Sequence, residues 1–252
     1  MVDAPLAGHE CLDAISRRQK AEKIARLVSS ERPLVGARIL DVGAGSGVIA
    51  AELASRVGQA GDVWAVDVRD SRILTEGYRF ALTEGTRLPC ESDSFDVVIS
   101  NHVIEHVGSR DKQLHHLREI ARVLRPDGVA YLATPNRWTL VEPHFDLPFL
   151  SWLPASMRSA YVRLARRGSV YDCELLTRSR LEELIAAAGF QASDRTIEAI
   201  RLTGEIENPG AFARVFIGAP KGIHHALRRA VPTLIFTLRR HPQSSVSERK
   251  WG

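Results

Sequence analysis

The sequence has few cysteines and no long apolar run, and both absences exclude whole classes of protein. Its three cysteines, Cys11, Cys90 and Cys173, are an odd number spread widely. They fit neither a disulfide framework nor the spacing of a metal site, and they favour a reducing cytoplasm. No stretch of about 18 apolar residues is present, which argues against a membrane-spanning helix. Residues 1–10 lack a basic start followed by an apolar run, so a secretory signal is not expected.

The excess of basic over acidic residues is confined to the end of the chain. Residues 221–252 hold seven basic side chains and one acidic side chain, a net charge of +6 within a total of +4. The remainder of the chain is therefore slightly acidic, which is not the pattern of a globally basic nucleic-acid-binding protein. The length of 252 residues suits one large α/β domain with a modest addition.

Apolar runs and helical spacings alternate along most of the chain. Helices are expected over residues 12–30, 49–57 and 114–124, and strands over 37–42, 62–68, 78–83, 95–100 and 129–134. A helix that ends at Gly189 follows, and strands near 195–202 and 212–218 complete the order. Strands that alternate with helices predict an α/β fold, a Rossmann-like doubly wound sheet of seven mostly parallel strands with helices on both faces.

The alternation is interrupted by a segment rich in aromatic residues, at about 136–176. It holds six of the 16 aromatic side chains of the protein, namely Trp138, Phe145, Phe149, Trp152, Tyr161 and Tyr171. Several prolines in its first half oppose a long regular element. We therefore expect an aromatic-rich cap inserted into a domain over residues 1–218, followed by a basic amphipathic tail over 219–252.

The sharpest local signal is the sequence Ile39-Leu40-Asp41-Val42-Gly43-Ala44-Gly45-Ser46-Gly47. A buried strand here runs into a turn whose glycines leave space for a ligand, and the backbone N–H groups of the next helix face that ligand. The third glycine of the dinucleotide fingerprint G-x-G-x-x-G would fall at position 48, which is Val48. Asp41 precedes the first glycine and is suited to bind an ammonium group.

Two further strand ends carry polar groups that an adenosine needs. Asp67 ends the second strand, where a carboxylate can accept hydrogen bonds from both ribose hydroxyls. Glu84 and Gly85 follow the third strand and offer a carboxylate and a backbone N–H to an adenine edge. Together with the glycine turn, these strand ends predict a site for an adenosine-bearing cofactor.

In this order the motifs resemble those of class I S-adenosylmethionine (SAM)-dependent methyltransferases, in the small-molecule branch known as methyltransferase type 11. The similarity covers about residues 35–135 well and 175–218 loosely. It is carried by residues 41–47, 67, 84–89, 94–98 and 118–128. The sequence departs from the branch at Glu84, where Asp is more usual.

The resemblance implies that SAM is the cofactor and S-adenosylhomocysteine the product. It implies that the glycine turn holds the methionine part of SAM, Asp67 the ribose, and Glu84 with Gly85 the adenine. The cofactor-binding residues expected on this basis are Asp41, Gly43, Ala44, Gly45, Gly47, Asp67, Val68, Glu84, Gly85 and Asn101.

Candidate catalytic residues follow the fourth strand, at the edge of the sheet where open α/β folds bind their ligands. His102 and His106 are four residues apart, which would place both on one face of a helix. Either could act as general base for a hydroxyl acceptor, or serve only in packing or capping. A zinc site would need a third ligand, recruited from His115, His116 or His144; none stands in register, so no metal is expected. His115 and His116 are interpreted as surface residues.

The aromatic insert predicts an acceptor pocket or its lid, with Trp138, His144, Phe145 and Tyr171 as candidate substrate-binding residues. A local helical cap with its own small core is the alternative, and both can hold together. Enzymes of this fold that methylate exocyclic amines of nucleic-acid bases often carry Asn/Asp-Pro-Pro-aromatic after the fourth strand. Here Asn101 is followed by His102 and Val103, so no nucleic-acid partner is expected.

Residues 224–240 place an apolar centre between paired arginines. This pattern is compatible with contact to an anionic membrane surface; a helix packed on the domain, or a partner interface, is the alternative. The expected location is the cytoplasm, with peripheral membrane contact as a further hypothesis.

The sequence therefore predicts an enzyme that transfers a methyl group from SAM to a small-molecule, lipid or lipid-linked saccharide acceptor. Oxygen is the expected acceptor atom, ahead of nitrogen or carbon. Two other functions stay open: a non-catalytic SAM-binding or scaffold protein, and an NAD(P)-dependent oxidoreductase, which Val48 disfavours. The motifs do not identify the acceptor or the oligomeric state.

Overall fold

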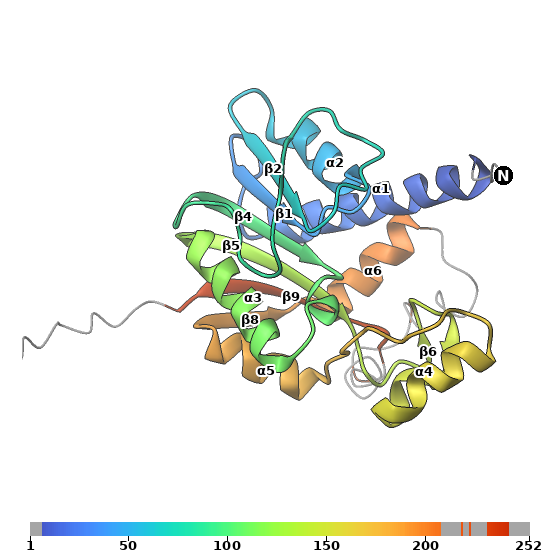
Figure 1. Cartoon of the computed structure of the whole chain (residues 1–252). Coiled ribbons are helices and arrows are strands. Elements are labelled where there is room, and N and C mark those ends of the chain that lie inside the picture. Colours follow the sequence, from blue (N-terminus) through green and yellow to red (C-terminus); the bar gives the residue numbers. More distant parts are fainter. Residues whose placement is uncertain (1–6, 208–217, 219–221, 223–230, 242–252) are drawn as a thin grey trace, which may run out of the picture.

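Seven strands form one sheet in the order β3-β2-β1-β4-β5-β9-β8 (Figure 1). The structure is a computed structural model that describes residues 7–207, 218, 222 and 231–241. The strands are β1 Arg38–Val42, β2 Asp62–Asp67, β3 Arg79–Leu82, β4 Phe95–Asn101, β5 Leu124–Pro135, β8 Phe190–Asp194 and β9 Thr233–Arg240. Strands β1 to β5 pair in parallel, whereas β9 is antiparallel to both β5 and β8. The predicted seven-stranded, mostly parallel sheet is confirmed.

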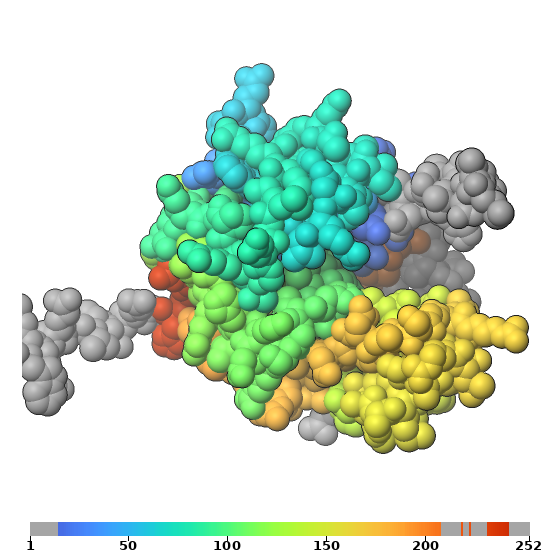
Figure 2. Space-filling view, in the orientation of Figure 1, coloured from blue at the N-terminus to red at the C-terminus, as the bar shows by residue number. Residues whose placement is uncertain are grey.

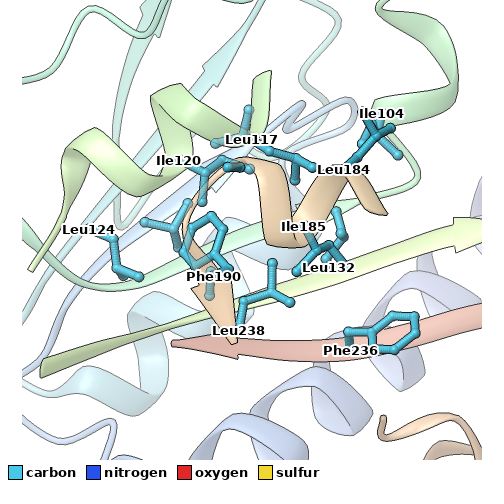
Figure 3. Packing of buried hydrophobic residues seen from close by; sticks show 14 of the residues in the cluster. Ile104, Leu117, Ile120, Leu124, Leu132, Leu184, Ile185, Phe190, Phe236 and Leu238 are labelled. Carbon is cyan, nitrogen blue, oxygen red and sulfur yellow. The ribbon is translucent and has the colours of Figure 1, made fainter. Parts of the chain in front are cut away.

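The central strands are buried on both faces because helices cover each face of the sheet. The residues of β4 are buried from Phe95 to Ser100 without alternation, as expected for a parallel strand between two helical layers. One face packs against α1 Ala7–Ser29, α2 Val48–Val57 and α6 Thr196–Ile206. The other face packs against α3 Arg110–Val123 and α5 Arg178–Ala187. Figure 3 shows this second core, in which Leu117 and Ile120 of α3 and Leu184 and Ile185 of α5 meet strand residues.

The connection between β2 and β3 is short and contains no helix. Residues 68–78 instead fold back over the glycine turn, where the backbone N–H groups of Ile73 and Leu74 donate hydrogen bonds to the Ser46 carbonyl at 2.9 and 3.1 Å. The segment between β2 and β3 therefore holds the glycine turn in place.

The C-terminal third differs from the sequence prediction. The strand predicted near 195–202 is wrong, because residues 196–202 lie in α6; a strand precedes them instead, β8 Phe190–Asp194. The predicted strand at 212–218 lies almost wholly outside the described residues. The last strand is β9, which inserts between β5 and β8.

Strand β9 also corrects the prediction of a separate tail over residues 219–252. The apolar centre of that segment, Leu234 to Leu238, is buried in the sheet, with Leu234 and Leu238 at 0% exposure. An apolar run between arginines is thus explained by a strand that pairs on both sides, with β5 and with β8. These residues are not available for the amphipathic membrane contact that the sequence suggested. Within the described residues, none of the helices combines the length and apolarity required to cross a bilayer.

The insert folds as a cap at one end of the sheet. It contains a short hairpin of β6 Val141–Glu142 and β7 Leu147–Pro148, the 3-10 helix η2 Leu150–Trp152, and the helix α4 Ala155–Leu164. Its small core consists of Leu147, Leu150 and Val162, with Phe145, Tyr161, Ala165 and Tyr171 packed around them. In Figure 2 the cap is the yellow lobe beside the body of the protein. Its two ends meet where Asn136 pairs with Leu176.

Candidate active site

The glycine turn lies between β1 and α2 at the carboxyl edge of the sheet. Gly43 and Gly47 have positive φ angles of 77° and 78°, which side chains rarely adopt. A Cβ on Gly43 would lie 2.4 Å from Val103 Cγ2, and one on Gly47 would lie 2.1 Å from the Tyr78 hydroxyl. Glycine is therefore required for the turn to approach both the end of β4 and the residues before β3.

Two carboxylates stand beside this turn. Asp67 Oδ2 accepts a hydrogen bond from Gly45 N at 2.9 Å, which places the end of β2 against the glycine turn. Asp41 is 2% exposed, and its Oδ2 has no hydrogen-bond partner among the described residues. Burial, with the nearby charge of Asp67, raises the pKa of Asp41 to about 7. A buried carboxylate with a free oxygen is suited to receive a cationic group of a ligand.

The other predicted cofactor residues lie at neighbouring strand ends. The Thr83 backbone N–H donates to the Asp67 carbonyl at 2.9 Å, so the turn with Glu84 and Gly85 starts beside the end of β2. Both residues are exposed, and no atom lies within 4 Å of the position that a Cβ on Gly85 would take. Val68 is 56% exposed, and Asn101 is half-buried at the end of β4. The structure thus brings the predicted cofactor residues to one edge of the sheet.

His102 and His106 do not share a helix face, contrary to the sequence prediction. His102 has a φ of 59° and lies before the 3-10 helix η1, Ile104–His106. Both histidines nevertheless lie near one residue of the cap, because the centroid of the His144 ring is 4.8 Å from that of His106 and 6.5 Å from that of His102. His106 Nε2 is 3.2 Å from His144 Nε2, and Cys173 Sγ is 3.7 Å from His106 Nδ1.

Two buried glutamates support this histidine cluster through contacts that the sequence did not predict. Glu142 Oε1 lies 2.7 Å from His144 Nδ1, and Glu105 Oε1 lies 3.3 Å from His102 Nδ1. Burial by itself would raise the pKa of Glu105, but the adjacent His102 and the nearby His106 outweigh it and lower this pKa. Glu105 lies between the two histidines in the sequence, so its position near them could have been predicted. Glu142 reaches the cluster only through the fold of the cap.

Another histidine also differs from its predicted place. His116 is 1% exposed rather than at the surface, and its Nε2 lies 3.0 Å from Ser100 Oγ of β4. Burial lowers the pKa of His116 to about 4. His115 is exposed and bonds to Thr86 Oγ1. Neither joins the cluster around His144.

The aromatic residues of the cap form two groups. Phe145 and Tyr171 face each other at 5.5 Å, and the buried Tyr171 hydroxyl has no hydrogen-bond partner among the described residues. Trp138 is 45% exposed and packs edge-on against Trp152 at 5.8 Å. The structure therefore groups Phe145 and Tyr171 near His144 and gives Trp138 a different neighbour.

Comparison with known proteins agrees with the cofactor site that this geometry indicates. Residues 13–193 match the family described as methyltransferase domain, which covers well over half of the chain. The chain belongs to this methyltransferase family. Together with the sheet order and the glycine turn, the family establishes a class I SAM-dependent methyltransferase, which favours an enzyme of this class over the oxidoreductase and scaffold alternatives.

Several relatives of this methyltransferase differ in the atom that they methylate. It is 30% identical over 198 residues to a ubiquinone biosynthesis O-methyltransferase of Sinorhizobium fredii, with 73% of this chain and 71% of the relative covered. It is 28% identical over 175 residues to a ubiquinone/menaquinone biosynthesis C-methyltransferase of Laribacter hongkongensis, with 63% and 69% covered. Similarity to the family therefore does not by itself select oxygen or carbon.

Solved structures share the fold of this methyltransferase at lower identity. A SAM-dependent methyltransferase from Aquifex aeolicus aligns with a TM-score of 0.51 and 17% identity, covering 76% of this chain and 91% of that chain. Phosphoethanolamine N-methyltransferase 2 of Haemonchus contortus, in complex with S-adenosylhomocysteine, aligns with a TM-score of 0.55 and 19% identity, covering 88% and 53%. These likenesses concern the fold alone.

Proposed function

We propose that this methyltransferase methylates a hydroxyl oxygen of a small molecule held between the glycine turn and the cap, with His106 as general base. The observation that carries the proposal is the position of the segment after β4. On one side Val103 packs against Gly43, and on the other His106 meets His144 and Cys173 of the cap. An acceptor in this position would face both the cofactor residues and a base.

The polar groups at the sheet edge fit SAM. We assign the unpartnered Asp41 carboxylate oxygen to the ammonium of its methionine part, and the Gly43–Gly47 turn to the backbone around it. Asp67 is assigned to the ribose hydroxyls, and Glu84 with Gly85 to the adenine. Val68 and Asn101 complete this set from the ends of β2 and β4.

Bound SAM supplies an electrophilic methyl group on its sulfonium sulfur, so much of the catalysis is alignment of the acceptor with that group. A hydroxyl is a weak nucleophile until its proton leaves. His106 would take this proton as the hydroxyl oxygen bonds to the methyl carbon and the carbon–sulfur bond breaks, which leaves S-adenosylhomocysteine. His102, the second predicted base, is held next to Glu105 instead.

The cap supports an acceptor with an apolar or aromatic part. Phe145 and Tyr171 lie near the histidine cluster and are assigned to this part of the acceptor, with His144 at its polar end. Oxygen as the acceptor atom is compatible with the O-methyltransferases among the relatives, and the choice of oxygen over carbon rests on the position of His106. The sequence argument for a lipid-linked acceptor came from the tail, and β9 removes that argument.

The test is methyl transfer from labelled SAM to a panel of phenols, catechols, aliphatic alcohols, amines and carbon acids. We expect O-methyl products, identified by mass spectrometry and NMR, from hydroxylated aromatic acceptors. His106→Ala should lower kcat by about 10²–10⁴-fold without weakening SAM binding. The matched control His115→Ala removes an exposed imidazole on α3 and should leave kcat unchanged. Products methylated at nitrogen or carbon, or an unaltered kcat in His106→Ala, would contradict the proposal.

A further inference from the structure

Two fully buried carboxylates lie between the end of β4 and the cap. Glu105 and Glu142 are both 0% exposed. In the part of the chain that the structure describes, their ion-pair partners are His102 and His144, and neither pairs with Lys or Arg. Buried charges in proteins are paired or coordinate metal ions. Two buried carboxylates without a Lys or Arg partner therefore form a place where a cation can bind.

One oxygen of Glu105 is left without a hydrogen bond. Glu105 Oε2 accepts a hydrogen bond from Thr134 Oγ1 at 2.9 Å. Glu105 Oε1 is buried and has no hydrogen-bond partner among the described residues. It points between two imidazoles, 3.3 Å from His102 Nδ1 and 3.8 Å from His144 Nε2. A buried, unpartnered carboxylate oxygen of this kind marks a place for a ligand that is not part of the chain.

His144 is oriented as a metal-binding histidine is. Glu142 Oε1 lies 2.7 Å from His144 Nδ1, while Glu142 Oε2 accepts the backbone N–H groups of His144 and Phe145, each at 2.9 Å. A proton on Nδ1 would point at a fixed carboxylate, and Nε2 on the other side of the ring lies 3.8 Å from Glu105 Oε1 and 3.2 Å from His106 Nε2. A carboxylate on the far nitrogen of a ligating histidine is the usual outer partner of a metal site.

The three inner atoms have the spacing of metal ligands. His102 Nδ1, Glu105 Oε1 and His144 Nε2 all lie within 4.8 Å of one another. Ligands of a tetrahedral zinc ion with bonds of about 2.1 Å are about 3.4 Å apart, close to the observed 3.3 and 3.8 Å. We propose that these three atoms bind a divalent transition-metal ion of the Zn²⁺ type, with Glu142 as the outer partner of His144.

Two imidazoles and one carboxylate select the class of metal. Imidazole suits Zn²⁺ and similar transition ions, whereas Mg²⁺ and Ca²⁺ prefer a shell of oxygen atoms. Three protein ligands leave one coordination position for water or an acceptor oxygen, as in catalytic rather than structural zinc sites. This proposal departs from the expectation of a metal-free site. That expectation considered histidines alone and required a third histidine in register.

The site also gives the proposed acceptor hydroxyl a place. A hydroxyl bound to the metal would lose its proton more readily, and His106, whose Nε2 is 3.2 Å from His144 Nε2, stands beside it to accept that proton. This catalytic use rests on the proposed function. Metal binding itself does not, because it is measured without SAM or acceptor.

The test is isothermal titration of the chelator-treated full-length protein with Zn²⁺, with Mg²⁺ in a parallel titration and metal content measured after dialysis. We expect one tightly bound Zn²⁺ per chain. Glu105→Gln and His144→Ala should each weaken binding at least about tenfold, and Glu142→Gln about 10–100-fold. His115→Ala, which removes an exposed histidine elsewhere, should bind as the wild type does. Melting curves of each variant verify that it is folded.

Unchanged Zn²⁺ affinity in both Glu105→Gln and His144→Ala, or no bound Zn²⁺ in the wild type, would overturn the site. Tighter binding of Mg²⁺ than of Zn²⁺ would overturn the assigned metal class. If Zn²⁺ binds as expected and no hydroxyl is methylated with or without it, the metal site stands and the proposed function fails.

Discussion

Asp41 is a single carboxylate on which the binding of SAM can be tested. Its pKa is raised to about 7 by burial and by Asp67. An ammonium group binds the ionised carboxylate, so the neutral form that prevails below that pH should bind SAM poorly.

We therefore expect the Kd for SAM to rise as pH falls through 7, by up to about tenfold per pH unit. Calorimetric titration between pH 5.5 and 8.5 measures it. Asp41→Asn should bind weakly at every pH and lose this dependence. A wild-type Kd that stays constant over the range would exclude Asp41 as the ammonium partner.

Gly47 separates the cost of backbone strain from the cost of a steric clash. An added methyl group at Gly47 would meet Tyr78 Oη and the Leu74 carbonyl, at 2.1 and 2.3 Å. At Gly189, after α5, the φ is similarly positive, 84°, but nothing lies within 4 Å of the added atom. Both Gly→Ala substitutions incur about 1–2 kcal/mol of strain, and Gly47→Ala should lose about 1–3 kcal/mol more through overpacking. Urea unfolding compares them; equal losses would contradict the clash.

At this scale the sequence was informative where the residues of a site are adjacent in the chain. The glycine turn and its preceding Asp41 could be predicted because one strand–turn–helix unit contains them all. The cluster of Glu105, Glu142 and His144 could not be predicted, because these residues meet only when the cap lies against the end of β4. Spacing along the chain carries no information about such a contact.

At the scale of the elements, β9 connects the edge strand β8 to the rest of the sheet. Leu238 is 0% exposed between β5 and β8. Leu238→Ala should therefore cost about 2–5 kcal/mol in the free energy of unfolding. The same change at Leu82, on the edge strand β3 and 60% exposed, should stay within about 0.5 kcal/mol. If chemical denaturation gave similar losses for both, the buried position of β9 would be wrong.

The elements that the sequence missed share a physical cause. Strand β8 is an edge strand in which Phe190 alone is buried, so its residues show no apolar alternation. Helix α6 has few apolar residues, and its sequence is equally compatible with a strand when the packing partners are unknown. Strand β9 was interpreted as a tail because its arginines and apolar centre suit a surface helix equally well. Pairing with β5 and β8 makes this segment a strand, and both partners are distant from it in the sequence.

For the whole molecule, Glu31 connects the beginning of the fold to its end. It follows α1, and its nearly buried carboxylate is bound by Arg195, Thr237 and Arg239. Burial opposes ionisation of Glu31, but these donors outweigh it and lower its pKa below 4.5. The group thus stabilises the fold above about pH 4.5, and this contribution disappears as pH falls through the lowered pKa.

Glu31→Gln should reduce the free energy of unfolding by about 1.5–3 kcal/mol at pH 7, with a difference that shrinks toward pH 3. Glu205→Gln is the control, since Glu205 is 62% exposed in its pair with Arg26. That variant should change stability by less than about 1 kcal/mol. Thermal melts across the pH range measure both. A Glu31→Gln difference that did not shrink in acid would refute the electrostatic explanation.

The position of β9 has a consequence for how the protein is made. Strand β8 pairs with β9, which is synthesised only after α6 and the residues that follow it. At about 5–20 residues per second, a ribosome needs several seconds to proceed from residue 194 to residue 240. During that interval the nascent chain already holds the glycine turn and the cap, yet β5 has an open edge facing solvent. A chaperone that shields this edge would act on the protein before β9 leaves the ribosome.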